Sequence, residues 1–249
     1  MADSIMINIE NLSKRFGDLI VLDDISLNVK EGENFVVFGQ SGTGKSVLLK
    51  CIIGLMNPDS GKIFIKDKNI VEVSKKELNK IRRNIGFLFQ GAALYDSMSV
   101  RQNLEFPLKK NFDFSQEEID EKVNKALEHV SLESAIDKMP SELSGGMKKR
   151  IGLARSIITE PELMLYDEPT TGLDPISSKE ISDLILTLQK RLNMTSIVVT
   201  HDLICANIIA DRAIFLRNSK ISNEGTIEEL VNSDDKFLKN FFSTEIVNE

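Results

Sequence analysis

The sequence predicts an α/β fold in which a phosphate-binding core carries an antiparallel β layer and an inserted helical subdomain. A glycine-rich loop joins an apolar strand to a helix, and apolar strands alternate with amphipathic helices over residues 163–216. A mostly helical block separates these two parts of the chain. Because strand and helix alternation gives right-handed crossovers between parallel strands, a largely parallel core sheet is expected.

The N-terminal residues predict the antiparallel layer. Apolar and polar residues alternate in two stretches, which is typical of strands with one buried face. The alternating apolar positions are Ile5, Ile7, Ile9, Ile25, Leu27 and Val29. A turn-forming sequence at 57–61 then precedes a further strand at 62–66. We expect the first two strands to pair with each other in an antiparallel arrangement.

A glycine-rich loop lies between the apolar strand at 35–38 and an amphipathic helix at 47–55. It matches the phosphate-loop pattern G-x-x-x-x-G-K-[ST] at every fixed position, with the residues Gly39, Gln40, Ser41, Gly42, Thr43, Gly44, Lys45 and Ser46. Glycine lets backbone N–H groups approach phosphates closely, and the following helix presents a positive end. Lys45 is expected to reach the β- and γ-phosphates, and Ser46 to bind Mg²⁺. The loop therefore predicts a nucleoside triphosphate site.

The chain is expected to form one nucleotide-binding domain over 1–249, with three internal parts. They are an α/β core with its β layer at about 1–73 and 160–225, a mainly helical subdomain at about 74–159 that includes a short strand at 85–89, and a helical tail at 226–249. The second part of the core alternates in a regular order, with strand 163–166, helix 177–192, strand 196–200, helix 203–209 and strand 213–216. Only short helices are expected after residue 216.

Composition limits the class of protein. With 249 residues, 41% of them apolar, the chain can bury a substantial core. It has no apolar run long enough to span a membrane and no N-terminal signal-peptide pattern, so a cytosolic protein is expected unless a partner tethers it. A net charge of −7 argues against nucleic-acid binding. Cys51 and Cys205 match no metal or disulfide spacing and are expected to be buried thiols.

Two adjacent carboxylates end the apolar strand at 163–166. Asp167 is expected to hold Mg²⁺ through water, and Glu168 to polarise an attacking water molecule. A simple turn at Asp-Glu-Pro is the plainer interpretation, but it accounts neither for the buried strand before these acids nor for the other motifs of the chain. The acids therefore favour hydrolysis of the bound nucleotide.

Further motifs accompany the phosphate loop and the two acids. They are Gln90 after the strand at 85–89, Leu-Ser-Gly-Gly-Met at 143–147, Gly-Leu-Asp at 172–174 and His201 after the strand at 196–200. In this order the chain resembles the nucleotide-binding subunits of ATP-binding cassette (ABC) transporters over about 5–224. The resemblance implies a phosphate-loop core of ABC ATPase type that hydrolyses ATP to ADP and phosphate with Mg²⁺.

The resemblance also implies a role for each motif. Glu168, His201 and Gln90 would act in catalysis, with Gln90 sensing the γ-phosphate and Mg²⁺ and His201 contacting the γ-phosphate. Phe16 would stack on the adenine, and Asp174 would contribute to nucleotide binding. The chemistry agrees, because imidazole can donate to a phosphate oxygen and an amide can bridge metal and water. Taken singly, Phe16 and His201 could equally be core residues, and Gln90 a solvated loop residue.

Ser144, Gly145 and Gly146 open a predicted helix. A serine hydroxyl and backbone N–H groups at a positive helix end form a second anion site. In the ABC family this site faces the nucleotide of the other subunit, which implies that two chains related by a two-fold axis enclose two ATP molecules. The basic residues at 148–150 either support that interface or form a solvated face. Met147 replaces the glutamine usual in the family, so the contact of that glutamine stays unassigned.

A narrower resemblance involves Met147 and the stretches at 90–100 and 139–142. These residues are similar to those of ATPases in Mla/Mce-type systems, which move phospholipids or other hydrophobic molecules between bacterial membranes. It implies a second copy of the chain, membrane permease subunits and a Mce-type lipid-binding protein as partners, on the cytoplasmic face of the inner membrane. An importer ATPase for amino acids or ions and a soluble ATPase for metal-cluster assembly stay open as alternatives.

An apolar group after Gln90 indicates a docking groove. Its members are Leu94, Tyr95, Met98, Leu104, Phe106 and Pro107. A short helix of a permease subunit could dock there, or the same residues could simply pack the helical subdomain. The aromatic residues at 237–242 are expected to cover the core of their own chain rather than that of a partner.

Overall fold

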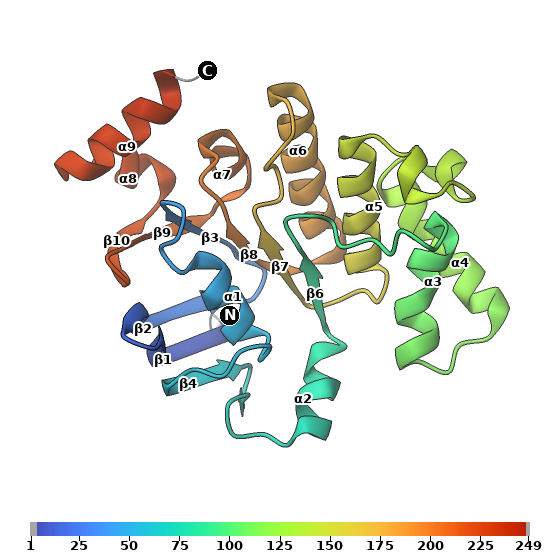
Figure 1. The fold of residues 1–249 in the computed structure, drawn as a ribbon, viewed down its shortest axis with the longest axis horizontal. Helices are drawn as coiled ribbons and strands as arrows, with labels where there is room; N and C mark the ends of the chain where they lie inside the picture. Colours follow the sequence, from blue (N-terminus) through green and yellow to red (C-terminus); the bar gives the residue numbers. More distant parts are fainter. Residues whose placement is uncertain (1–3, 248–249) are drawn as a thin grey trace.

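The computed structural model describes residues 4–247, which form two sheets and a helical block (Figure 1). The smaller sheet has the strand order β2-β1-β4-β5 and the larger one β10-β9-β3-β8-β7-β6. The helical block lies beyond β6, at the end of the large sheet that is remote from β10 (Figure 1). The predicted α/β class with an antiparallel layer and a helical insertion is confirmed.

The small sheet is antiparallel throughout. Its strands are β1 (Ile5–Phe16), β2 (Leu19–Lys30), β4 (Ser60–Ile65) and β5 (Lys68–Asn69). β1 pairs with both β2 and β4, in registers that place Ile9 opposite Leu27 and Ile63. These three side chains are buried, because alternate residues of each strand face the core sheet. The predicted antiparallel pairing of the first two strands is confirmed.

The large sheet is parallel except at one edge. Its parallel strands are β3 (Asn34–Gly39), β6 (Ile85–Leu88), β7 (Leu163–Asp167), β8 (Thr195–Val199) and β9 (Arg212–Arg217). Every residue of β3, β7 and β8 is buried, as expected for central strands covered on both faces. The carboxyl ends of β3, β7 and β8 therefore lie side by side, where three of the predicted motifs begin.

Two features of this sheet differ from expectation. The strand β6, which the sequence places inside the helical block, pairs with β7 and so belongs to the core sheet. β10 (Lys220–Gly225) pairs antiparallel with β9 at the other edge, where only helices are expected. Its polar, half-exposed residues do not show the apolar alternation of a strand, which is why sequence reasoning misses it.

Helices cover both faces of the large sheet. α1 (Lys45–Ile52) packs with the small sheet on one face, in a core that includes Val37, Leu48 and Ile214. The opposite face is covered by α6 (Pro175–Leu192), α7 (Leu203–Ile209), α8 (Ile227–Val231) and α9 (Lys236–Val247). Leu238 and Phe242 of α9 are fully buried there. The expectation that the C-terminal aromatic residues cover their own chain is confirmed.

The helical block has a core of its own. After the surface helix α2 (Lys75–Arg82) and β6, the chain forms α3 (Val100–Asn111), α4 (Gln116–His129), two short 3₁₀ turns (Glu133–Ala135 and Pro140–Glu142) and α5 (Gly145–Ile157). Capping boxes begin α3 at Ser99 and α4 at Ser115. Nearby residues therefore specify where these two helices begin. Helix α5 connects the helical block to the rest of the molecule through contacts with β6 of the large sheet and with α6, which covers that sheet.

Cys51 and Cys205 are both buried and unpaired with each other, as predicted. Among residues 4–247, no helix combines the length and apolar character needed to cross a membrane.

Candidate nucleotide-binding site

The phosphate-binding loop runs from the buried end of β3 to the first residue of α1. Gly44 is the N-cap of α1 with φ 99°, a conformation that side-chain-bearing residues rarely adopt. A Cβ at Gly44 would also lie only 2.7 Å from the carbonyl oxygen of Val21. Glycine is therefore required here both by conformation and by the close approach of β2. The loop consequently brings its backbone N–H groups to the positive end of α1.

Lys45 is buried at the inner side of this loop. Its Nζ donates to the carbonyl oxygens of Gly39 at 2.6 Å and Gln40 at 3.1 Å, and lies 3.6 Å from Oε1 of Glu168. Burial lowers the pKa of Lys45, while the charge and hydrogen bond of Glu168 oppose that shift. The ammonium is thus fixed against the loop, where a phosphate held by the loop would meet it.

Ser46 and Asp167 are joined directly although 121 residues separate them. The Ser46 hydroxyl donates to Oδ1 of Asp167 at 2.8 Å, between the start of α1 and the end of β7. Hydroxyl and carboxylate oxygens are ligands that Mg²⁺ accepts, and Mg²⁺ normally completes its shell with water and substrate phosphates. Among residues 4–247, no cluster of three His, Cys, Asp or Glu side chains could hold a metal alone. The pair fits a Mg²⁺ ion that a nucleotide helps to bind.

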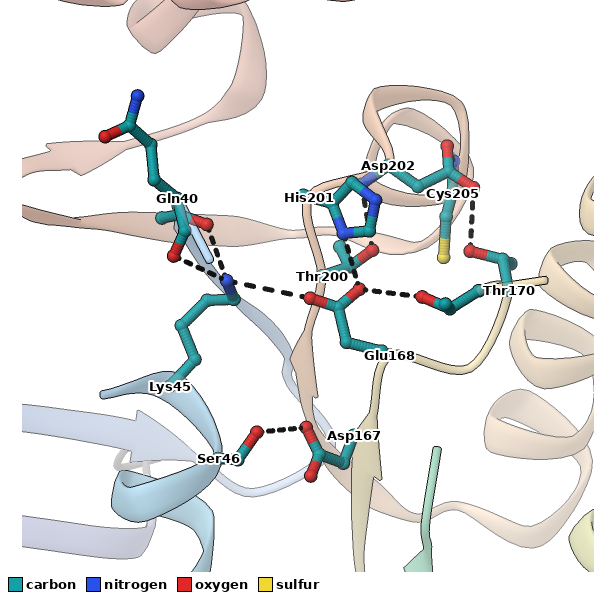
Figure 2. A network of polar contacts seen from close by, with 12 residues as sticks. Gln40, Lys45, Ser46, Asp167, Glu168, Thr170, Thr200, His201, Asp202 and Cys205 are labelled. Atoms are coloured by element: carbon teal, nitrogen blue, oxygen red, sulfur yellow. Dashed lines mark hydrogen bonds and ion pairs between the residues drawn. The ribbon is translucent and has the colours of Figure 1, made fainter. Parts of the chain in front are cut away.

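Glu168 lies between two nitrogen-bearing side chains (Figure 2). Its Oε2 lies 2.8 Å from Nδ1 of His201, and its Oε1 faces Lys45. Burial would raise the pKa of Glu168, but the hydrogen bonds and charge of His201, together with the charge of Lys45, outweigh it and lower this pKa. The lowered pKa favours the ionised form of the carboxylate, which is the form that can accept a proton.

The segment after His201 is held by a network that sequence reasoning does not reveal. The Thr170 hydroxyl donates to Oδ2 of Asp202 at 2.7 Å, and the backbone N–H of Asp202 donates to the Thr200 hydroxyl at 3.0 Å. Asp202 also caps α7 by accepting from the N–H of Cys205 (Figure 2). The only sequence signal is an aspartate before an apolar helical stretch, which indicates a cap. This network fixes the turn that carries His201.

Lys45, Ser46 and Glu168 line one cavity of about 970 Å³, a size suited to a nucleotide. Besides loop residues, its lining includes Gln90, Glu168 and His201, so the structure brings these predicted residues together. The sequence does not predict a further wall of this cavity, which is formed by Phe237, Asn240 and Phe241 of α9. The last helix of the chain therefore borders the phosphate-binding loop.

Other predicted residues lie outside this lining. Phe16 is 48% exposed at the end of β1, with Nζ of Lys14 at 5.7 Å from its ring, and Val21 supplies apolar lining beside the loop. Ser144 caps α5 by accepting from the N–H of Met147, and Gly145 and Gly146 follow it in the first turn. Nucleotide contacts of these residues stay predictions.

Asp174 has a structural task within one chain. Its carboxylate caps α6 by accepting from the backbone N–H of Ser177 at 3.0 Å and from the Ser177 hydroxyl at 2.6 Å. These hydrogen bonds lower the pKa of Asp174. It is also absent from the cavity lining, and its contribution to nucleotide binding stays a prediction.

The fold and the loop define a phosphate-loop nucleoside triphosphatase. A family model described as "ABC transporter" matches residues 22–171, from β2 to just after β7. The chain belongs to the ABC transporter family and is an ATPase subunit of such a transporter, which confirms the predicted resemblance.

Relatives and solved structures agree with this assignment. The chain is 41% identical over 238 residues to an intermembrane phospholipid transport ATP-binding protein, MlaF, of Haemophilus influenzae, covering 94% of this chain and 90% of that protein. It is 39% identical to a methionine import ATP-binding protein, MetN, of Clostridium tetani. That match covers 96% of this chain and 75% of MetN.

Two solved structures are similar over most of this chain. One is a dimeric ATP-binding cassette in a post-hydrolysis state with ADP and Pi, with a TM-score of 0.80 and 32% identity. The match covers 89% of this chain and 99% of that cassette. The other is cbiO1 of Clostridium perfringens, part of an ABC transporter complex, with a TM-score of 0.84 and 30% identity. The match covers 99% of this chain and 94% of cbiO1. Both are ABC ATPase cassettes, which agrees with the fold described above.

Proposed function

We propose that this chain energises the transport of phospholipid or another hydrophobic molecule through membrane permease subunits. The similarity to MlaF over almost the whole of both chains supports this substrate class. Met147 within the 143–147 motif supports it too, because the sequence resemblance to Mla/Mce-type ATPases includes that residue. The similarity to MetN is nearly as high, so an importer of amino acids or ions is the rival function.

The observation that supports the catalytic proposal is the position of Glu168 at the cavity wall, between Lys45 and His201. Glu168 accepts a proton from a water molecule as that water attacks the γ-phosphorus. The bond from the γ-phosphorus to the bridging oxygen breaks, and ADP leaves with that oxygen. Lys45 and His201 bind the phosphate oxygens on which negative charge is concentrated, and Gln90 positions the water.

Ser46 and Asp167 are proposed to hold Mg²⁺ together with the nucleotide. A Mg²⁺ ion held there would supply positive charge that neutralises the phosphates of the nucleotide. Asp167 is buried, so its carboxylate is fixed by the end of β7 and by the Ser46 hydroxyl before any ligand binds. This preorganisation allows the two residues to meet a metal without rearrangement of the backbone.

A second copy of the chain is the proposed partner at the nucleotide. Ser144 lies on the helical block and is exposed at the start of α5, outside the cavity that holds Lys45. Its hydroxyl and the first N–H groups of α5 are free of the core sheet and suit the phosphates of a nucleotide on a facing chain. The dimeric state of a similar cassette agrees with this arrangement.

The permease is proposed to dock on the helical block near Tyr95. This ring is 40% exposed and packs edge-on against Phe106 at 5.1 Å, with the Arg155 guanidinium 4.8 Å from its centre. A cavity of about 200 Å³ beside it includes Pro107 in its lining. Leu104 is fully buried in the helical core, so it packs the subdomain and does not belong to a groove. The rest of the predicted groove is retained, on the cytoplasmic face of the membrane.

An affinity pull-down from solubilised membranes of the native host tests this function, with Glu168→Gln and ATP holding the closed state. We expect a membrane permease and a Mce-type lipid-binding protein to be recovered together. Recovery of an importer permease with an amino-acid or ion receptor would replace the lipid proposal by its rival. Recovery of soluble partners alone would contradict transport and favour a role such as metal-cluster assembly.

The docking surface has a separate test. Tyr95→Glu places a charge on the proposed contact, so transport in reconstituted vesicles should fall while the isolated ATPase keeps its turnover. Tyr95→Phe is the matched control, because it keeps the ring and its contact with Phe106. Equal transport by the two variants would contradict docking at this surface.

A further inference from the structure

Helix α5 holds the loop after Gln90 at three positions along one face. Lys149 donates to the carbonyl oxygen of Gln90, and Arg155 donates to that of Ala93. Between them, Gly152 packs so closely that an added Cβ would lie 2.9 Å from Cβ of Ala92. Because these α5 residues are spaced by three, they lie on the same side of the helix. Two hydrogen bonds and one close packing contact therefore hold the loop at 90–93 against residues 149–155 of α5.

Lys149 makes a second contact, which reaches the catalytic centre. Its Nζ lies 3.2 Å from the carbonyl oxygen of Glu168, as well as donating to Gln90. Glu168 has φ 51°, a left-handed conformation that residues other than glycine seldom adopt and that requires support from its surroundings. The Lys149 ammonium provides a hydrogen bond at that position. One side chain thus bridges the loop at Gln90 and the end of β7.

The burial of Lys149 excludes both sequence-based interpretations of this residue. Lys149 is 6% exposed, whereas its neighbour Lys148 is exposed on the same helix. Burial lowers the pKa of Lys149, while the nearby charges of Glu168 and Asp167 oppose the shift. A buried ammonium is costly unless its donors are satisfied, so its two carbonyl contacts are a specific arrangement. Only Lys148 fits a solvated face.

We propose that Lys149 is a positioning residue that couples the helix beginning at Ser144 to Gln90 and Glu168. A displacement of α5, which carries the proposed contact with the facing nucleotide, then shifts the water-positioning loop and the proton acceptor together. The proposal rests on the proposed roles of Gln90 and Glu168, and it adds the link by which the helical block controls them. Lys149 itself donates its hydrogen bonds to the backbone oxygens of Gln90 and Glu168 and takes no part in bond making.

The test compares Lys149→Met and Lys149→Arg with the control Lys148→Met in the full chain. Methionine keeps the length of the lysine stem but donates no hydrogen bond, whereas arginine keeps the donors. We expect Lys149→Met to lower kcat about tenfold through misplacement of the catalytic groups, with KM for ATP changed less than about twofold. Lys149→Arg should recover most of the turnover, and Lys148→Met should match the unmodified chain.

Hydrogen exchange of the peptide at 90–95 gives a readout independent of turnover. Exchange there should quicken in Lys149→Met and stay unchanged in Lys148→Met, because Lys149 donates to the Gln90 carbonyl and Lys148 is exposed to solvent. If Lys149→Met does not fold, Lys149→Gln replaces it, since the amide retains donors and should give an intermediate kcat. Turnover and exchange equal to those of the control would overturn the proposal.

A merely structural role has a different signature. In that case kcat, ATP affinity and the unfolding temperature would fall together and arginine would not restore turnover, which would also overturn the proposal. Glu168→Gln, assayed in parallel, tests the proposed function separately. Full turnover of Glu168→Gln would remove the proton-acceptor role, whereas the exchange and kcat of Lys149→Met still decide whether Lys149 positions the loop.

Discussion

Nδ1 of His201 lies 2.8 Å from Oε2 of Glu168, so the end of β8 and the end of β7 are joined through their side chains. The other carboxylate oxygen faces Lys45 at 3.6 Å, which links the same group to the phosphate-binding loop. Glu168 is thereby oriented from both sides. Three strands of the core sheet thus contribute to the placement of one carboxylate. Changes at the end of any of these strands should therefore alter the rate of ATP hydrolysis.

Glu168→Gln should abolish most turnover while leaving ATP binding intact. The amide has nearly the same shape as the carboxylate but cannot accept the proton of the attacking water, so kcat should fall by a factor on the order of 10² to 10⁴. ATP should then hold two chains together, which light scattering after gel filtration would detect. Glu121→Gln on the exposed face of α4 is the control and should behave as the unmodified chain. Equal phosphate release by the two variants would refute the assignment.

His201→Ala should move the acid limb of the kcat profile to higher pH. Burial raises the pKa of Glu168 and His201 counteracts it, so loss of His201 leaves the burial effect less opposed and the pKa rises. The carboxylate then becomes protonated, and unable to accept a proton, at a higher pH than before. The control is His129→Ala, which changes the only other histidine of the chain. An acid limb that stays in place would show that Glu168 does not govern it.

The sequence predicts those residues of the site that belong to short sequence motifs. Lys45, Ser46, Asp167 and Glu168 are each specified by a short motif at the end of a buried strand, and the sheet then brings these strand ends together. Lys149 could not be assigned in this way. Its place between Gln90 and Glu168 depends on the packing of α5 against the sheet, and a Lys-Lys-Arg sequence does not reveal which lysine is buried.

The same distinction explains the fold. Strands with apolar alternation, such as β1 and β2, were predictable, whereas β10 pairs through its backbone at a sheet edge and carries mostly polar side chains. The helical character of α9 follows from its sequence, but where α9 docks does not. Its contacts with Phe38 and Phe215 join residues remote in the chain, and these contacts put α9 beside the nucleotide cavity.

His129 should make stability depend on pH near neutrality. Burial lowers the pKa of His129, and the charges of Arg191 and Lys125 add to this effect, while Glu128 and Glu160 oppose it. The unfolded chain therefore binds a proton more readily than the folded chain. The stabilising contribution is complete above the ordinary pKa of about 6.5 and is lost as pH falls below it toward the folded value.

His129→Gln removes this titration, so its free energy of unfolding should change less between pH 7 and pH 5 than that of the unmodified chain. Urea unfolding at several pH values measures the difference. His201→Gln, at a half-exposed position, serves as the control and should retain the pH dependence due to His129. Parallel pH profiles for the unmodified chain and His129→Gln would contradict this origin.

Phe241→Ala should weaken both the fold and ATP binding, because this ring serves two surfaces at once. It packs edge-on against Phe215 at 4.9 Å and Phe38 at 6.3 Å, and it also lines the cavity beside the phosphate-binding loop. We expect a loss of about 2 kcal/mol in unfolding free energy, less than for a fully buried phenylalanine. Loss of about 1 kcal/mol of apolar contact at the cavity should raise KM for ATP about fivefold.

The control is Phe114→Ala. Phe114 is another half-buried phenylalanine, which packs in the helical block away from the cavity, so this variant should lose stability without a change in KM. An equal KM in the two variants would show that α9 covers the core but contributes nothing to the nucleotide site.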